Sequence, residues 1–414
     1  MHTPLDEHAF AGAFRAGDSR RYGVDLKKNR KAVIDSAIAT ATNGFPAFSP
    51  IHATFVKGRK CSSVSDYSQA LILRVLAKFI ARRFRVEIKN RDRAVKGVIE
   101  TLSDSTPIYL VRRDISSFYE TLPLERTIKR LTHDVFVPML LRKHLNCFFS
   151  TFCATTTIGL PRGICLSPIL AELAMEEFDK AVRQLPGVYK YFRYSDDILI
   201  FSYEPTGNIE TALPNFLPTG MSFNATKSAS ISLNCEDKGH QAIVQLEYLG
   251  YSYRVSNMCG SKDPRKVYVG ISDRKISKLK TKILCCLKAN QRDKDFQLLK
   301  DRLRFLSGNY VVYRQGATSV KSSKYAKSGI HYNYRLCGTS ENGEVNKHQG
   351  AELKALDGFY QSLIRPGSTI GARFNPVQRN ALKTISFFKG FELKLMTRFS
   401  AQRVQEIKRA WRNV

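Results

Sequence analysis

Three aspartates are the residues of this sequence whose type and spacing could carry out chemistry. Asp196 and Asp197 are adjacent in the segment YSDD, and Asp114 follows an apolar stretch nearer the N-terminus. Adjacent carboxylates repel each other, and a divalent cation relieves that repulsion. Mg²⁺ prefers a few carboxylates together with water and phosphate oxygens. If one antiparallel sheet brings the three acids together, they could hold two metal ions for phosphoryl transfer. The alternative is a pair of ordinary acidic turns.

Strands and turns must position these acids. The apolar residues 108–111 predict a short buried strand that leads to the first aspartate. In KYFRYSDDILIFSY (190–203), apolar and aromatic residues on both sides of the acidic pair predict two strands joined by a tight turn. A loop with glycine and proline, 159–167, precedes a helix for which we expect Ser167 as N-cap and Pro168 as the first helical residue.

Apolar residues at helical spacing predict several further helices. One covers 66–81, and a helical region covers 124–146. After the loop, Leu170, Ala174, Phe178 and Val182 form an apolar stripe on one helix. Towards the C-terminus, we expect a basic helical unit at 272–304, a loop-rich polar segment at 313–350 and helices at 351–414.

The motifs together resemble those of a known family. DISSFYE (114–120), GLPRGICLSPIL (159–170), YSDD (194–197), NATK (224–227) and YLGY (248–251) occur in the order of the palm motifs of reverse transcriptases. The resemblance covers about residues 60–310 and is closest to the bacterial retron and group II intron enzymes. FYE in the first motif and LAE after the second resemble the defence-associated "unknown group" enzymes, and the N-terminal and thumb sequences resemble the smaller polymerase of the type III systems.

The resemblance implies roles for the residues of the metal centre. Asp114 and Asp196 would be the main metal ligands, with the backbone of Ile115 beside them and Asp197 as a weaker third carboxylate. The metal would be two Mg²⁺ ions, with Mn²⁺ as an alternative. Lys227 would neutralise or protonate the leaving pyrophosphate; the alternative is a solvated surface lysine.

The resemblance also implies residues that bind the incoming nucleotide. Tyr119 would lie beneath the sugar and exclude a 2′-OH; the alternative is an ordinary core aromatic. The loop containing Gly163 and Ser167 would let template and nucleotide approach the backbone closely. Arg91 and Arg93 lie near the fingers motif that holds the triphosphate; the alternative for both is a solvated basic helix.

Further residues are expected to contact nucleic acid. The family usually has PQG where this chain has Pro161-Arg162-Gly163, so Arg162 is a candidate contact to template phosphate or base. Leu249, Gly250 and Tyr251 would form the turn that grips the primer. Lys278 and Lys282, in the basic helical unit, would lie along the duplex backbone. Between 310 and 335, tyrosines alternate with bases, which favours stacking on single strands or, alternatively, a solvated loop.

The composition supports a nucleic-acid partner. The 414 residues include 66 Lys and Arg against 36 Asp and Glu, a net charge of +30. Such a charge attracts polyanions. No run approaches the roughly 18–20 apolar residues of a membrane span, and the N-terminus has no signal pattern, so we expect a cytoplasmic protein without a membrane partner. Nine cysteines without a CxxC pair indicate reduced thiols.

These inferences predict an α+β right-hand polymerase with fingers, an antiparallel-sheet palm, a helical thumb and a C-terminal helical extension. The expected boundaries are 1–100 for the N-terminal segment and fingers, 101–258 for the palm with part of the fingers, 259–312 for the thumb and 313–414 for the basic, helical extension. The expected reaction is RNA-directed addition of dNTPs to a DNA 3′ end, and the resemblance implies a dedicated non-coding RNA as template and a role in antiphage defence. A second reverse transcriptase or a second copy of the chain is a candidate partner. The alternatives are template-independent synthesis of the abortive-infection type and a catalytically idle RNA-binding scaffold.

Overall fold

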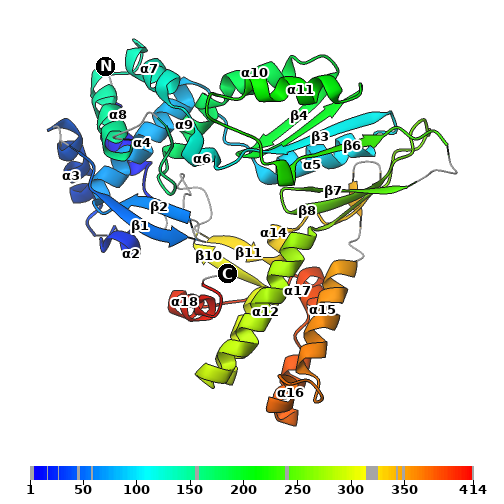
Figure 1. Cartoon of the computed structure of the whole chain (residues 1–414). Helices are drawn as coiled ribbons and strands as arrows, with labels where there is room; N and C mark the ends of the chain where they lie inside the picture. Colours follow the sequence, from blue (N-terminus) through cyan, green and yellow to red (C-terminus); the bar gives the residue numbers. More distant parts are fainter. Residues whose placement is uncertain are drawn as a thin grey trace. The chain divides into compact units, whose positions relative to one another are not determined.

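The computed structural model describes most of the chain. The described residues are 4–15, 17–26, 28–43, 47–56, 59–153, 158–237, 242–313, 325–341, 344–346 and 350–412. They divide into two compact units (Figure 1). The first contains the described residues of 1–90 and 108–232, and the second those of 91–107, 233–313 and 325–414. The four predicted domain boundaries stay predictions.

The N-terminal part of the first unit is built around one buried helix, α4 (Tyr67–Arg83). The Asp66 carboxylate accepts a hydrogen bond from the Gln69 N–H at 2.7 Å, which caps its first turn and explains where the helix begins. Its middle is buried on all sides, as expected for a core helix. The helix predicted for 66–81 is confirmed. Around it lie α1 (Glu7–Ala11), α2 (Asp18–Tyr22), α3 (Arg30–Thr42), β1 (Pro50–Val56) and β2 (Arg59–Val64).

A four-stranded sheet forms the second part of this unit, with the order β4-β5-β3-β6. The strands are β3 (Ile108–Asp114), β4 (Val188–Tyr194), β5 (Asp197–Ser202) and β6 (Ala229–Leu233). The central strand β5 is buried on both faces and is antiparallel to both β3 and β4. Helix α10 (Glu176–Arg183) packs on β4 and contacts α11 (Gly207–Phe216) (Figure 1). The two strands predicted around the acidic pair are confirmed.

Two helix predictions in this unit need correction. The region predicted as helical from 124 contains α7 (Glu125–His133) and α8 (Met139–Phe152), because Pro138 disfavours helical conformation in the residue before it. The apolar stripe from Leu170 to Val182 was expected to lie on one helix. It lies on two, α9 (Ser167–Ala174) and α10, which are separated at Met175. Two short elements, α6 (Phe118–Thr121) and the 3-10 turn η1 (Ala225–Lys227), complete the described elements of this unit.

The second unit contains a five-stranded sheet with the order β13-β12-β9-β8-β7. Its strands are β7 (Ile243–Tyr248), β8 (Tyr251–Ser256), β9 (Val267–Ile271), β12 (Gly338–Glu341) and β13 (Glu344–Asn346), and helix α5 (Arg91–Ser103) packs against β9 and β12. The segment 313–350 was expected to be loop-rich, but its described part contributes β12, which pairs with β9 (Thr339 opposite Tyr268). This pairing joins residues about 70 apart, beyond the reach of a local pattern.

The remaining described elements of this unit are mainly helices. Helix α12 (Asp273–Asp293) packs against α13 (Phe296–Ser307) and α15 (Ala351–Ile364) (Figure 1). The basic helical unit and the C-terminal helices are therefore confirmed. The others are β10 (Asn309–Tyr313), β11 (Tyr325–Gly329), α14 (Ile330–Asn333), η3 (Gly371–Arg373), α16 (Pro376–Lys383), α17 (Phe387–Glu392), β14 (Met396–Thr397) and α18 (Ala401–Arg409). Among the described helices, none is both long and apolar enough to cross a bilayer.

Candidate active site

The antiparallel register brings the three predicted acids to one end of the four-stranded sheet. Asp114, the last residue of β3, lies opposite Asp197, the first residue of β5. Tyr194 and Asp197 pair across β4 and β5, so Ser195 and Asp196 form the two-residue turn between them. The N–H of Ile115 donates to the carbonyl of Asp196 at 3.0 Å, which ties the turn to the end of β3.

The electrostatics of this cluster reflect crowded negative charge. Asp114 is buried, and its two carboxylate oxygens each accept a hydrogen bond from Lys227 Nζ at 2.8 Å. Burial, together with the charges of Asp196 and Asp114, raises the pKa of Asp197 to about 6, against the opposing charges of Arg112 and Lys227. The Arg112 guanidinium lies 3.8 Å from Asp197 Oδ1. A carboxylate whose ionised form is disfavoured in this way is stabilised by a nearby cation.

Lys227 is held in place by its own short element. Asn224 caps η1, and its side chain accepts a hydrogen bond from the Thr226 N–H at 3.1 Å. The Asn224 N–H donates to the carbonyl of Asp114 at 2.7 Å, so η1 is fixed to the end of β3. The NATK segment thus positions the lysine through its backbone. Lys227 is one-third exposed and bonded to an acid, which differs from a fully solvated surface lysine.

The donor set fits a hard divalent cation by its chemistry. Three carboxylates lie at neighbouring register positions, and Mg²⁺ and Mn²⁺ favour such oxygen ligands. Within the described ranges, however, no three acidic, histidine or cysteine side chains converge in a ready-made metal cluster. Lys227 instead supplies the positive charge at Asp114. The metal roles of Asp114, Ile115, Asp196 and Asp197 stay predictions.

Tyr119 and Arg162 lie beside each other in the same unit. The Arg162 guanidinium lies 5.0 Å from the centre of the Tyr119 ring, and it forms a two-point ion pair with Glu120 at 2.6 and 3.0 Å. Tyr119 is half-buried, and burial raises the pKa of its hydroxyl, which is hydrogen-bonded to Ser195 in the acidic turn. The hydrogen bonds from Arg162 to Glu120 raise the pKa of the guanidinium. Sequence reasoning missed Glu120, although the FYE segment contains it.

The loop 159–167 is fixed to β2 and to its own helix. The Ser62 N–H donates to the carbonyl of Arg162 at 2.6 Å. Gly163 has a φ of +93°, and a Cβ there would lie 2.6 Å from the Ser62 carbonyl oxygen, so only glycine fits. Ser167 was expected to be the helix N-cap, but this is wrong by one residue. Its hydroxyl donates to the Pro161 carbonyl at 2.7 Å, and Leu166 occupies the N-cap position.

A buried ion network beneath the acidic turn was not predicted. The Arg193 side chain is fully buried and bonds to both oxygens of Asp179, at 2.6 and 2.8 Å, and to Glu172 at 2.7 Å. It also donates to the carbonyl of Ser195 at 3.3 Å. Burial works against the charge of Arg193, but the two acids outweigh it and raise its pKa. A basic residue inside an apolar strand, two positions before the turn, is the sequence signal that could have indicated this network.

In the second unit, the YLGY turn is stabilised by Arg91. Leu249 and Gly250 form the two-residue turn between β7 and β8, and both have positive φ, as in a type I′ hairpin. The Arg91 Nε and Nη2 atoms donate to the Leu249 carbonyl at 3.0 and 2.7 Å, and its guanidinium lies 4.7 Å from the centre of the Tyr251 ring. These contacts favour a structural role for Arg91 over triphosphate binding. Arg93 is exposed on the first turn of α5. The nucleotide-binding assignment of both arginines stays a prediction.

The other predicted nucleic-acid contacts lie in the second unit or outside the described residues. Lys278 is exposed, and Lys282 lies one turn further along α12 with its Nζ 5.9 Å from the centre of the Trp411 ring. Tyr310 stacks on Phe305 with ring centres 4.0 Å apart, so this tyrosine packs inside the unit. Arg314, Lys321 and Lys324 lie outside the described residues, as do the side chains of Tyr313 and Tyr325.

The sheet with acids at one end, paired antiparallel strands and surrounding helices defines an α+β protein of the right-hand polymerase class. Residues 19–253 match the family described as reverse transcriptase (RNA-dependent DNA polymerase). Because this match covers more than half of the sequence, the chain belongs to the reverse transcriptase family. The predicted fold class and the reverse transcriptase family are confirmed, whereas the narrower resemblance to retron, intron and defence-associated enzymes stays a prediction.

Other comparisons add little detail. A solved structure of apo telomerase from Candida tropicalis, truncated from the C-terminal domain, is similar with a TM-score of 0.31 and 12% identity. The similarity covers 45% of this chain and 43% of that chain, so this chain spans less than half of the telomerase. No curated protein matches the sequence.

Proposed function

We propose that this chain is an RNA-directed DNA polymerase that adds deoxynucleotides to a 3′ end. The observation that supports this most directly is the register of β3 and β5, in which Asp114 lies opposite Asp197 and beside the turn that contains Asp196. The family match and the net charge of +30 support a nucleic-acid substrate.

The proposed roles of the side chains follow from their positions. When bound, two Mg²⁺ ions (or Mn²⁺) supply activation of the primer 3′-OH and neutralisation of the triphosphate. Asp114, Asp196 and Asp197 would hold them, with the Ile115 backbone at the same site. Lys227 lies 2.8 Å from Asp114, and this proximity supports a role in neutralising or protonating the leaving pyrophosphate.

Two near-isosteric substitutions test this proposal. We expect Asp114→Asn and Asp196→Asn each to lower primer extension more than about 10²-fold, because charge neutralisation dominates phosphoryl transfer. Asp35→Asn, an exposed change on α3, is the matched control and should extend normally. Circular dichroism and RNA binding should be unchanged in all three variants, although Asp114→Asn also loses its ion pair with Lys227 and should show some change in melting temperature. Normal extension by either active-site variant would refute the proposal.

We further propose that the template is a dedicated non-coding RNA and that the activity serves bacterial defence against phage. The motif resemblance to retron, intron and defence-associated enzymes supports this. Sequencing the copurified nucleic acid and plating phage on cells with the wild-type chain or Asp196→Asn test it. A mixed RNA population, or equal protection by the two chains, would contradict it.

A template-independent polymerase is a second candidate, favoured by one observation. Arg162 replaces the usual glutamine of the second motif and is held by Glu120 at 2.6 Å beside Tyr119. An ion pair in this position changes the surface offered to a template. Sequencing the DNA product separates the candidates, because templated DNA is complementary to an RNA of the cell and untemplated DNA matches none.

A further inference from the structure

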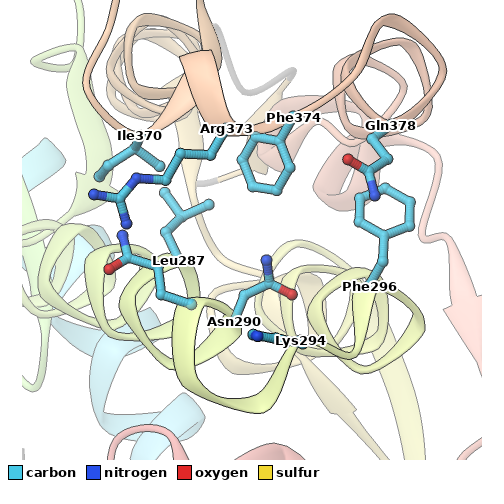
Figure 2. Close-up of a pocket in the computed structure, with 9 residues that line it drawn as sticks. Leu287, Asn290, Lys294, Phe296, Ile370, Arg373, Phe374 and Gln378 are labelled. Atoms are coloured by element: carbon cyan, nitrogen blue, oxygen red, sulfur yellow. The ribbon is translucent and has the colours of Figure 1, made fainter.

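A pocket in the second unit lies apart from the acidic turn in the chain and has no role in the proposed reaction. The C-terminal end of α12 and the start of α13 form one side, and η3 and α16 form the other (Figure 2). Its volume is about 370 Å³. This lies within the range of small-ligand sites, roughly 300–1,000 Å³.

Apolar and aromatic side chains form the walls of this pocket. Leu287 and Phe374 are buried, and the rings of Phe296 and Phe374 have centres 6.3 Å apart at an angle of 57°. The rings are therefore not stacked on each other. In Figure 2, the Phe374 ring and the Asn290 amide extend into the hollow from opposite sides. Such walls suit a planar ring, since every nucleobase offers a π face to an aromatic side chain.

A buried acceptor in the pocket lacks a partner. The Oδ1 atom of Asn290 is buried and accepts no hydrogen bond from the residues that the structure describes. Leaving such a group unsatisfied costs about 1–3 kcal/mol, and native proteins rarely retain one without a reason. The oxygen has almost no exposed surface as it stands, so the Asn290 side chain must turn it toward the hollow before a ligand N–H can donate to it and remove the cost. An apolar ligand would not remove the cost.

Two cationic side chains line the same pocket. Lys294 and Arg373 are both exposed and come from opposite sides of it. Lys294 is the C-cap residue of α12, with a φ of 51° and its N–H bonded to the Asn290 carbonyl, so its backbone position is fixed. An aromatic wall, a buried acceptor and two cations match the three parts of a nucleotide: the ring face, the ring N–H donors and the phosphate.

We propose that this pocket binds one unpaired nucleotide of a single-stranded nucleic acid. The base lies against Phe374 and Phe296, its amino or imino group donates to Asn290 Oδ1, and its phosphate lies near Arg373 and Lys294. The inference concerns binding by the second unit and does not require polymerase activity. A strand held here is anchored by a base as well as by its charge.

Photocrosslinking tests this proposal on the full-length chain. The probes are RNA and DNA oligonucleotides of about 12 nucleotides, within the usual span of single-strand sites, carrying 5-iodouracil. Irradiation in about 0.3 M salt suppresses binding by charge alone. We expect crosslinks in peptides that contain Phe296 or Phe374. The probe that crosslinks more efficiently identifies RNA or DNA as the natural strand.

Three variants make the test specific. Asn290→Leu removes the acceptor at similar volume and should weaken binding about 3- to 10-fold, with an unchanged or higher melting temperature. Arg373→Gln should weaken binding to a similar extent, whereas Lys288→Gln, the same charge loss outside the pocket on α12, should change it less than about 2-fold. The proposal is overturned if neither peptide crosslinks, or if Asn290→Leu binds like the Lys288→Gln control. The Asp196→Asn variant should crosslink like the wild-type chain, so that this test does not depend on whether the polymerase proposal is correct.

Discussion

Among single residues, Tyr119 offers the sharpest test of substrate choice. Its ring is half-buried between Phe118, in edge contact at 5.3 Å, and the Arg162 guanidinium at 5.0 Å, and its hydroxyl bonds to Ser195. If the ring excludes a 2′-OH by collision, Tyr119→Val should admit ribonucleotides while retaining part of the deoxynucleotide activity. The ratio of dNTP to rNTP incorporation measures this.

The control for this prediction is Tyr119→Phe. It keeps the ring, so sugar selection should be retained although the bond to Ser195 is lost. A core aromatic without a selective role gives a different result for Tyr119→Val: a cavity costing about 3–5 kcal/mol, early melting and an unchanged ratio. A stable valine variant that still refuses ribonucleotides rules out the gate.

A substitution at Gly163 tests the close approach of the loop 159–167 to the Ser62 carbonyl. Gly163→Ala forces a Cβ to 2.6 Å from the Ser62 carbonyl oxygen at a φ of +93°, so we expect a loss of about 1–3 kcal/mol in the free energy of unfolding. Primer extension should fall as well. Gly358→Ala in α15 is the matched control, since a Cβ there meets nothing within 4 Å and alanine favours a helix by up to about 1 kcal/mol. Equal melting temperatures for the two variants would contradict the close approach seen here.

At the scale of elements, the β4–β5 hairpin depends on Arg193. One guanidinium joins Asp179 and Glu172 to the carbonyl of Ser195, so helices α9 and α10 hold the acidic turn through a single buried cation. Removing that charge would leave the buried Asp179 with only Lys89, at 3.2 Å, and the Tyr191 hydroxyl as partners, at a cost of up to about 3–5 kcal/mol. The network therefore serves to position the turn, without touching substrate.

Arg193→Lys separates positioning from folding. Lysine keeps the charge but cannot form the planar fork to two carboxylates. We expect a folded protein whose kcat falls about 10- to 100-fold, because small displacements of catalytic groups are costly, while the KM for dNTP changes little. Arg183→Lys, an exposed change on α10, should leave both constants unchanged. If kcat falls only in proportion to the fraction of folded protein, the positioning role is contradicted.

These elements show what a sequence can and cannot predict. The strands around YSDD and helix α4 follow from apolar spacing and an aspartate cap, which are local signals. No local signal in the sequence marks the break at Met175, and the true N-cap at Leu166 goes with a bond from the Ser167 hydroxyl back to Pro161 in the preceding loop. The β12–β9 pairing and the Arg193 network join distant segments. The acids and Lys227 were found from spacing and family resemblance, but Arg193, which holds the acidic turn, was not.

For the whole molecule, the net charge of +30 determines the nonspecific affinity for nucleic acid and its dependence on salt. Charge alone gives binding to any polyanion. The affinity of such binding falls as the salt concentration rises, because the release of counterions from the nucleic acid then contributes less free energy. A shaped site adds stacking and hydrogen bonds, which salt screens far less. The salt dependence of RNA affinity therefore distinguishes nonspecific binding by charge from binding of one dedicated RNA.

The last prediction uses this difference. A nonspecific complex with about ten phosphate contacts on a single strand should lose roughly 10³- to 10⁴-fold in affinity between about 0.15 and 0.5 M salt. A dedicated RNA should remain bound after a wash at about 0.5 M salt and appear as one discrete species on sequencing. The Asp196→Asn variant is the control, because a catalytic change should not affect retention of the template. Recovery of only a heterogeneous population that washes away, from both proteins, would show that charge alone accounts for binding.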